Sequence, residues 1–319
     1  MPASPIISAP VVRNCDADQC RDVLPVRRLW VWWHLLSLDA PTVAVVWCWF
    51  FAAAFGLSLP PTALITLALG TWCVYVADRL LDGWRSTGMT ELRDRHWFYL
   101  RHRKPFLVAW IAAAIPLAYL ILFRVQAAVR TDDIVLCLIG TGYFLLIHNR
   151  PEKYGFSKEL FVGFLFSIAT VVPTWTRLQE GRGLLLSGVL AFGAACWLNC
   201  VAIQTWEDAE ARREGVHDRF FQNRLPEGQL QVDQCGPPLL TNFLGKHLTA
   251  FAIAIGGLAL LLICIPAVRM AWPLFAAVAI SSFMFLALVC HKMRFSALSL
   301  RILADGALLT PLVFFLHQR

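Results

Sequence analysis

The sequence predicts an all-α fold, a polytopic membrane protein organised as a bundle of about nine transmembrane helices. Two observations carry this prediction: 58% of the 319 residues are apolar while only 15% are charged, and the mean hydropathy is +0.60. An average soluble domain contains about 25% charged residues. The same composition excludes a disordered chain and a small secreted domain held by disulfides.

Nine apolar runs can be read as membrane helices, because a helix needs roughly 20 apolar residues to cross the hydrocarbon core. The runs are 33–57, 61–81, 105–123, 132–148, 159–176, 184–205, 244–268, 271–290 and 298–317. The run at 132–148 is the weakest, since its uninterrupted apolar stretch is short. We therefore expect a polar tail over residues 1–28 and a single transmembrane domain over residues 29–319.

The basic residues collect in alternate loops. Of the 28 Lys and Arg residues, 21 fall in the N-terminal tail and in the segments after every second span, six fall on the other side, and Arg79 lies within a span. Basic residues favour cytoplasmic loops, so the N-terminus is expected in the cytoplasm, as in an integral protein of a bacterial inner membrane. The net charge of +7 then reflects topology, and no nucleic-acid partner is expected.

A pair of carboxylates ends the second span. Asp78 and Asp82 are four residues apart and share one helix face. Charged groups inside a membrane helix are costly and usually functional. A bound Mg²⁺ ion would relieve the repulsion between the two carboxylates through its positive charge. This ion prefers one or two carboxylates together with substrate phosphate oxygens. The alternative is a solvated helix end with Arg79 and Arg85 as partners.

A second acidic cluster ends the sixth span, where Gln204, Glu207 and Asp208 lie near one another on the helix. It is expected at the same membrane face as the first, and the alternative is an exposed helix end with Glu–Arg pairs. Asn199, earlier on this helix, is a candidate cavity residue with Gln204, or else a helix–helix hydrogen-bonding residue. Asp305 in the last span is interpreted as the partner of Arg301, one turn away.

A third element opens the fifth span, where Tyr154 precedes Lys158. A lysine at a helix N-terminus opposes the helix dipole, which favours a nearby anion. Glu159 could be that partner, but a lysine and a helix N-terminus together also suit a phosphate group.

These elements resemble the UbiA superfamily of intramembrane prenyltransferases, in span number and in motif order along the whole chain. Asp78 and Asp82 match the family's Asn-x-x-x-Asp-x-x-x-Asp motif, with Val74 in place of the asparagine. Its Tyr-x-x-x-Lys element is matched by Tyr154 and Lys158, and its Asp-x-Pro element in the first helix by Asp39-Ala40-Pro41. The second aspartate motif is eroded: Glu207 stands for its first aspartate and Ala211 for its second.

The resemblance implies a nine-helix bundle whose active site opens to the cytoplasm, and Mg²⁺-dependent ionisation of an isoprenyl diphosphate. The prenyl cation would pass to a lipophilic or aromatic acceptor. The residues implied as metal ligands are Asp78, Asp82, Glu207 and Asp208, and those implied as diphosphate-binding are Arg79, Tyr154, Lys158 and Arg212. Asp78, Asp82 and Glu207 are expected across one cavity, with Lys158 pointing into it.

Two other functions remain open at this point. A membrane terpene cyclase on the same scaffold would ionise the same diphosphate and let the chain's own double bonds trap the cation, without an acceptor. A non-catalytic membrane bundle would have lost its second metal site, as the eroded motif allows.

Overall fold

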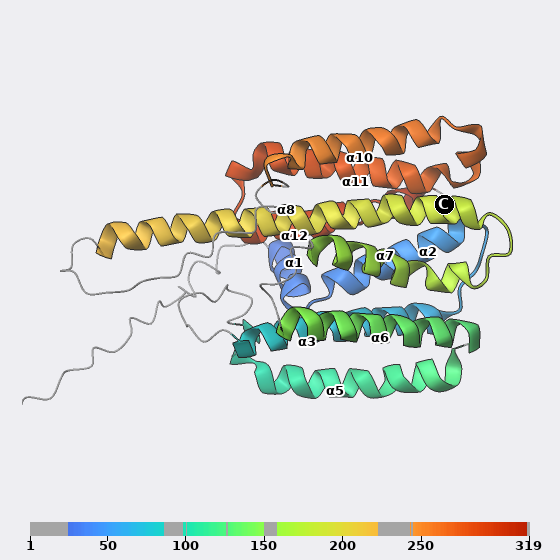
Figure 1. Cartoon of the computed structure of the whole chain (residues 1–319), viewed down its shortest axis with the longest axis horizontal. Helices are drawn as coiled ribbons and strands as arrows, with labels where there is room; N and C mark the ends of the chain where they lie inside the picture. Colours follow the sequence, from blue (N-terminus) through green and yellow to red (C-terminus); the bar gives the residue numbers. More distant parts are fainter. Residues whose placement is uncertain are drawn as a thin grey trace, which may run out of the picture.

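The computed structural model describes residues 25–85, 98–99, 101–125, 127–149, 158–222, 243 and 245–317, and the regular elements of this part are all helices. The long helices lie side by side and run alternately in opposite directions between the two ends of the bundle (Figure 1). The all-α prediction is confirmed for the described residues.

Each predicted apolar run coincides with a helix, except that the first includes the end of α1 and the turn before α2, and the last is divided into two. The α-helices are α1 (Pro25–Leu35), α2 (Asp39–Ala54), α3 (Pro61–Arg85), α5 (Arg103–Tyr119), α6 (Ala127–Asn149), α7 (Lys158–Trp175), α8 (Arg182–Gln222), α10 (Leu248–Ile263), α11 (Trp272–His291), α12 (Ala297–Ala307) and α13 (Pro311–His317). A π-helical turn, Leu120–Arg124, continues α5, and short 3₁₀ turns, Pro266–Ala271 and Lys292–Arg294, flank α11.

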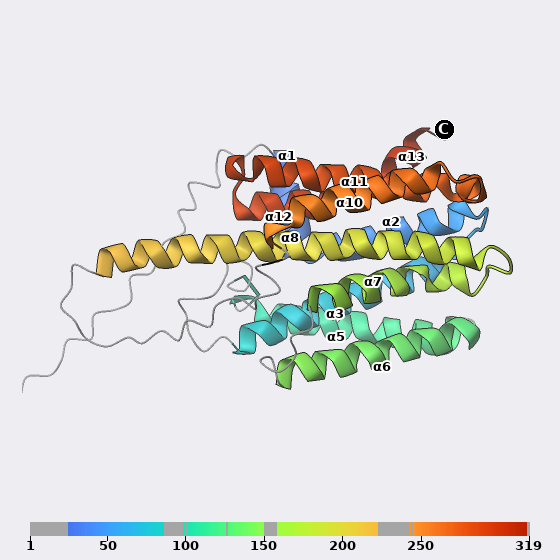
Figure 2. The same ribbon diagram turned by 45° about the horizontal axis from the view of Figure 1, so that its top comes forward.

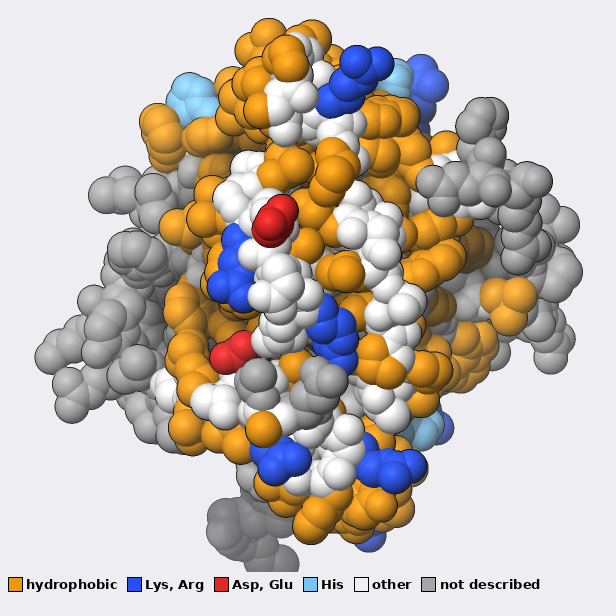
Figure 3. Space-filling model, turned by 90° about the vertical axis from the view of Figure 1, so that its right-hand side faces the viewer, with side chains coloured by type: hydrophobic (Ala, Val, Ile, Leu, Met, Phe, Trp, Pro, Cys, Tyr) orange, Lys and Arg blue, Asp and Glu red, His pale blue; other side chains and the backbone are white. Residues whose placement is uncertain are grey.

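Long apolar helices give the chain the character of a membrane protein. Within the described residues, four are long and apolar enough to cross a bilayer: Pro61–Leu81, Arg103–Arg124, Arg182–Glu210 and Pro266–Arg294. A fifth is added if the bent pair α1–α2 counts as one span. Outward-facing side chains such as Val108 and Ile115 in α5 are 66% and 67% exposed, as suits contact with lipid. Seen from one end, hydrophobic side chains cover most of the described surface, with charged side chains near the centre and at the upper and lower edges (Figure 3).

Helix α8 is central to the packing. It contacts α7, α10, α11 and α12, and in both views it runs between the α10–α11 pair and α7 (Figures 1 and 2). Gly163 of α7 lies against the α8 backbone, where an added Cβ would be 2.7 Å from the main-chain nitrogen of Trp197. Small residues allow such close approach of membrane helices.

An aromatic core joins α2 to α8. The rings of Trp47 and Phe192 stack with centroids 4.1 Å apart, and both side chains are fully buried. Trp47 also donates a hydrogen bond from Nε1 to the Leu308 carbonyl at 2.7 Å, which ties α2 to the end of α12. These contacts hold α2, α8 and α12 in a fixed relation close to the polar residues described next.

The chain bends by 92° between α1 and α2. Ser37, in the connecting turn, has a φ of 56°, a left-handed conformation that few non-glycine residues adopt. Side chains of α3 donate hydrogen bonds to carbonyls at the end of α1: Trp72 donates from Nε1 to the Leu36 carbonyl at 3.0 Å, and Arg79 donates to the His34 carbonyl, which also accepts from the Ser37 main-chain nitrogen. The bend lies at the end of the bundle from which the C-terminal half of α8 projects (Figure 1).

Candidate functional site

A cluster of polar side chains, all buried except the half-buried Asp305, lies at the bend between α1 and α2. His34 comes from α1, Asp39 from the first turn of α2, Arg79 from α3, Asn199 from α8 and Asp305 from α12. Exposed fractions are 1% for His34, 3% for Asp39 and 5% for Arg79. Ionisable groups this deep in an apolar bundle are a candidate functional site, since their burial is costly without partners.

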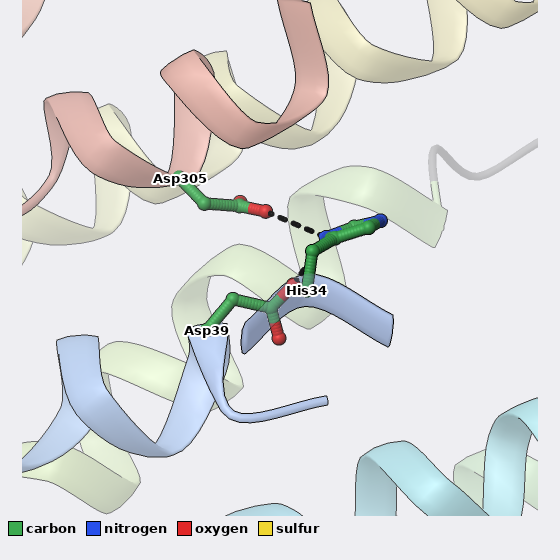
Figure 4. Close-up of side chains that lie close together, drawn as sticks. All are labelled: His34, Asp39 and Asp305. Atoms are coloured by element: carbon green, nitrogen blue, oxygen red, sulfur yellow. Dashed lines mark hydrogen bonds and ion pairs between the residues drawn. The ribbon is translucent and has the colours of Figure 1, made fainter. Parts of the chain in front are cut away.

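His34 faces two carboxylates, as Figure 4 shows. Its Nδ1 lies 2.8 Å from Asp39 Oδ2 and 3.8 Å from Asp305 Oδ2. The second oxygen of Asp39 accepts a hydrogen bond from the Ala40 main-chain nitrogen at 2.9 Å, and that of Asp305 accepts one from Asn199 Nδ2 at 3.0 Å. Within the described structure, two buried atoms of this cluster have no hydrogen-bond partner, His34 Nε2 and Asn199 Oδ1.

Arg79 closes the cluster from the α3 side. Its Nη1 donates to the His34 carbonyl at 3.0 Å and to Ser37 Oγ at 2.5 Å, and its Nη2 lies 3.7 Å from Asp39 Oδ2. The hydroxyls of Ser37 and Tyr99 are hydrogen-bonded at 2.6 Å, and the guanidinium lies 5.6 Å from the centre of the Tyr99 ring. Burial raises the pKa of the Tyr99 phenol above its ordinary value, so it stays a neutral hydrogen-bonding group.

The predicted residues of α3 fall at this same end of the bundle. Asp78 is half-buried beside Arg79, and Asp82 lies one turn further along α3. The side chains of Asp82, Lys158, Ala211 and Arg212 lie outside the described part of the structure, although each residue belongs to a helix, and Tyr154 lies outside it altogether. Where these four side chains and Tyr154 point therefore stays a prediction.

Three predicted residues of α8, Gln204, Glu207 and Asp208, have partners within the protein. Glu207 forms an ion pair with Arg301 of α12, and Gln204 donates a hydrogen bond to Asp208 Oδ1 at 2.7 Å. The interpretation of Asp305 as the partner of Arg301 is therefore wrong. Although the two residues are one turn apart on α12, α12 packs against α8 so that Arg301 meets Glu207 and Asp305 meets Asn199. Asn199 thus makes a helix–helix hydrogen bond, one of the two roles expected for it.

Sequence reasoning missed His34 and undervalued Asp39. His34 stands at the start of the first apolar run and carries no motif of its own. The available signal was its spacing: an ionisable side chain five residues before Asp39-Ala40-Pro41, at the edge of an apolar run, is costly unless the two groups meet. Comparison of the chain with protein-family models, curated proteins and solved structures gave no match.

Proposed function

We propose that the protein is an intramembrane, Mg²⁺-dependent enzyme that ionises an isoprenyl diphosphate and transfers the prenyl group to a lipophilic or aromatic acceptor. One observation carries the proposal. Helix α3 ends with Asp78 and Asp82 one turn apart, directly beside Arg79, at the end of the bundle that holds the buried polar cluster. Charged groups concentrated at one depth of an apolar bundle suit a substrate with an anionic head and a hydrocarbon tail.

The α3 carboxylates suit Mg²⁺, because this ion is held by one or two carboxylates and completes its shell with water and substrate phosphate oxygens. When bound, Mg²⁺ neutralises the diphosphate and makes it a better leaving group. On α8 the fit is less direct, since Glu207 is paired with Arg301 and Asp208 accepts from Gln204. For a second ion, Glu207 and Asp208 would exchange these partners for the metal.

Lys158, Arg212 and Tyr154 complete the proposed site as partners of the diphosphate oxygens. Lys158 is the first residue of α7, so the free N–H groups of that helix end add to its charge. Arg79 contributes its positive charge while it stays bonded to the His34 carbonyl. The proposal includes the nine-span topology, with the N-terminus and the site on the cytoplasmic side of a bacterial inner membrane.

The test uses the full chain purified in detergent with geranyl, farnesyl or geranylgeranyl diphosphate and Mg²⁺, and follows pyrophosphate release and products by mass spectrometry. We expect Mg²⁺-dependent turnover that is lost with chelator and needs an acceptor for a prenylated product. Pyrophosphate release with cyclised hydrocarbon and no acceptor would instead identify a terpene cyclase. No turnover of any of the three diphosphates would favour a non-catalytic bundle.

A further inference from the structure

We propose that His34, Asp39 and Asp305 form a second metal site, distinct from the α3 aspartates, that binds a transition-metal ion of the Zn²⁺ type. One ligand atom of each residue lies within 4.8 Å of the others. They come from three helices, α1, α2 and α12, that meet at the bend, and Figure 4 shows the imidazole and the two carboxylates turned toward one another. The proposal is independent of any action on a diphosphate.

The spacing of the ligand atoms suits a small tetrahedral ion. Two ligands at the usual Zn–N and Zn–O distances are about 3.3 Å apart in a tetrahedral site. Here His34 Nδ1 lies 2.8 Å from Asp39 Oδ2 and 3.8 Å from Asp305 Oδ2. One distance is shorter and the other longer than the separation expected in a tetrahedral site. One carboxylate oxygen of Asp39 and one of Asp305 also lie within 4.8 Å of each other. An ion between the three groups needs only small side-chain shifts.

The ligand types select the kind of metal. An imidazole nitrogen with carboxylate oxygens suits Zn²⁺, and Mn²⁺ less well, whereas Mg²⁺ prefers oxygen ligands alone. The site therefore differs in chemistry from the proposed Mg²⁺ site at Asp78 and Asp82. Three protein ligands leave a fourth position for water or another small ligand.

A second, independent observation is the amide of Asn199. This side chain is 8% exposed, its Nδ2 is bonded to Asp305 Oδ1, and its Oδ1 is buried without a hydrogen-bond partner. A buried acceptor without a donor is costly. A water bound at the fourth position of the metal would supply the donor that this oxygen lacks.

A bound cation would also balance the charge of the cluster. When Asp39 and Asp305 are both ionised they carry two negative charges, and Arg79 Nη2 at 3.7 Å from Asp39 compensates one. With neutral His34, one negative charge is then left away from water, which is unfavourable. A Zn²⁺ ion with a bound hydroxide supplies one net positive charge. A proton on His34 or on Asp305 is the competing solution, and the experiment below separates metal from proton.

The experiment measures metal in the full chain, purified without a polyhistidine tag and without chelator. We expect close to one equivalent of Zn²⁺ by elemental analysis. We also expect a rise in unfolding temperature when Zn²⁺, but not Mg²⁺, is returned to chelator-treated protein. Asp305→Asn and His34→Gln should lower bound Zn²⁺ by about tenfold or more. Asp78→Asn and the remote Asp132→Asn should retain it, so failure here is distinct from failure of the proposed diphosphate chemistry.

A spectroscopic measurement keeps the test decisive if the variants do not fold. Co²⁺ added to the chelator-treated wild type should give the intense visible absorption of a tetrahedral site, and Zn²⁺ should displace it. No visible band, or Zn²⁺ bound equally by Asp305→Asn, would overturn the proposal. An unfolding temperature that does not change when Zn²⁺ is added would also overturn it and leave a proton on His34 or Asp305 as the compensating charge.

Discussion

Arg79 of α3 donates a hydrogen bond from Nη1 to the main-chain carbonyl of His34, in the last turn of α1, at 3.0 Å. A helix C-terminus favours a cation, because its last carbonyls are free and carry the negative end of the helix dipole. Asp78 precedes Arg79 in α3, so the helix that carries the candidate Mg²⁺ ligands also fixes the bend between α1 and α2.

Replacing Arg79 should therefore destabilise the whole protein. Arg79→Gln removes the charge facing Asp39 and leaves a buried carboxylate without compensation, a change that costs about 3–5 kcal/mol in buried ion pairs. We expect a clear fall in the unfolding temperature measured in detergent. Arg294→Gln is the matched control, since Arg294 is exposed, and it should change the unfolding temperature little. Equal unfolding temperatures for the two variants would contradict the structural role of Arg79.

The α3 carboxylates should be needed for turnover and not for folding. Asp78→Asn and Asp82→Asn each remove a charge with little change of shape, so packing is kept while the affinity for Mg²⁺ falls. We expect prenyl diphosphate turnover to be abolished and the unfolding temperature to stay near that of the wild type. Asp132→Asn on α6 is the control and should remain active. Full activity in both α3 variants would show that Asp78 and Asp82 only form a solvated helix end.

The helices could be predicted from the sequence because lipid allows few alternatives: a long apolar run must satisfy its own backbone hydrogen bonds, and a helix does so. That Asp78 and Asp82 lie one turn apart near the end of α3 followed from their four-residue spacing. The contact between His34 and Asp305 could not be predicted from the sequence. It depends on how α1 and α12 pack, and no local sequence pattern indicates that packing. The packing of α12 against α8 likewise explains why Arg301 does not pair with Asp305 one turn away and instead forms an ion pair with Glu207.

The contact between α7 and α8 should depend on Gly163. A Cβ at this position would lie 2.7 Å from the Trp197 main-chain nitrogen, and backbone atoms cannot move aside cheaply. Gly163→Ala should therefore lower stability by about 1–3 kcal/mol through overpacking. Gly257→Ala on α10, where no atom lies within 4 Å of the added Cβ, is the control and should be neutral or slightly stabilising. The measurement is thermal unfolding of both variants in the same detergent, and a neutral Gly163→Ala would contradict the close approach.

The ion pair between Glu207 and Arg301 allows the proposed Mg²⁺ site on α8 to be tested against a purely structural role for Glu207. The variants are Glu207→Gln, Arg301→Gln and the double variant, each titrated with Mg²⁺ while turnover of a prenyl diphosphate is measured. If Glu207 holds metal, Glu207→Gln and the double variant should both need more Mg²⁺ for half-maximal turnover. Arg301→Gln, which frees Glu207, should need less.

Ala211→Asp adds the carboxylate that the eroded motif lacks. It should lower the half-saturating Mg²⁺ concentration on the order of tenfold, because the number of anionic ligands helps to set affinity for the ion. A double variant that titrates like the wild type would show that Glu207 serves only to hold Arg301. If Ala211→Asp then also changes nothing, the α8 cluster binds no metal, and a single Mg²⁺ ion at Asp78 and Asp82 would have to carry the chemistry alone.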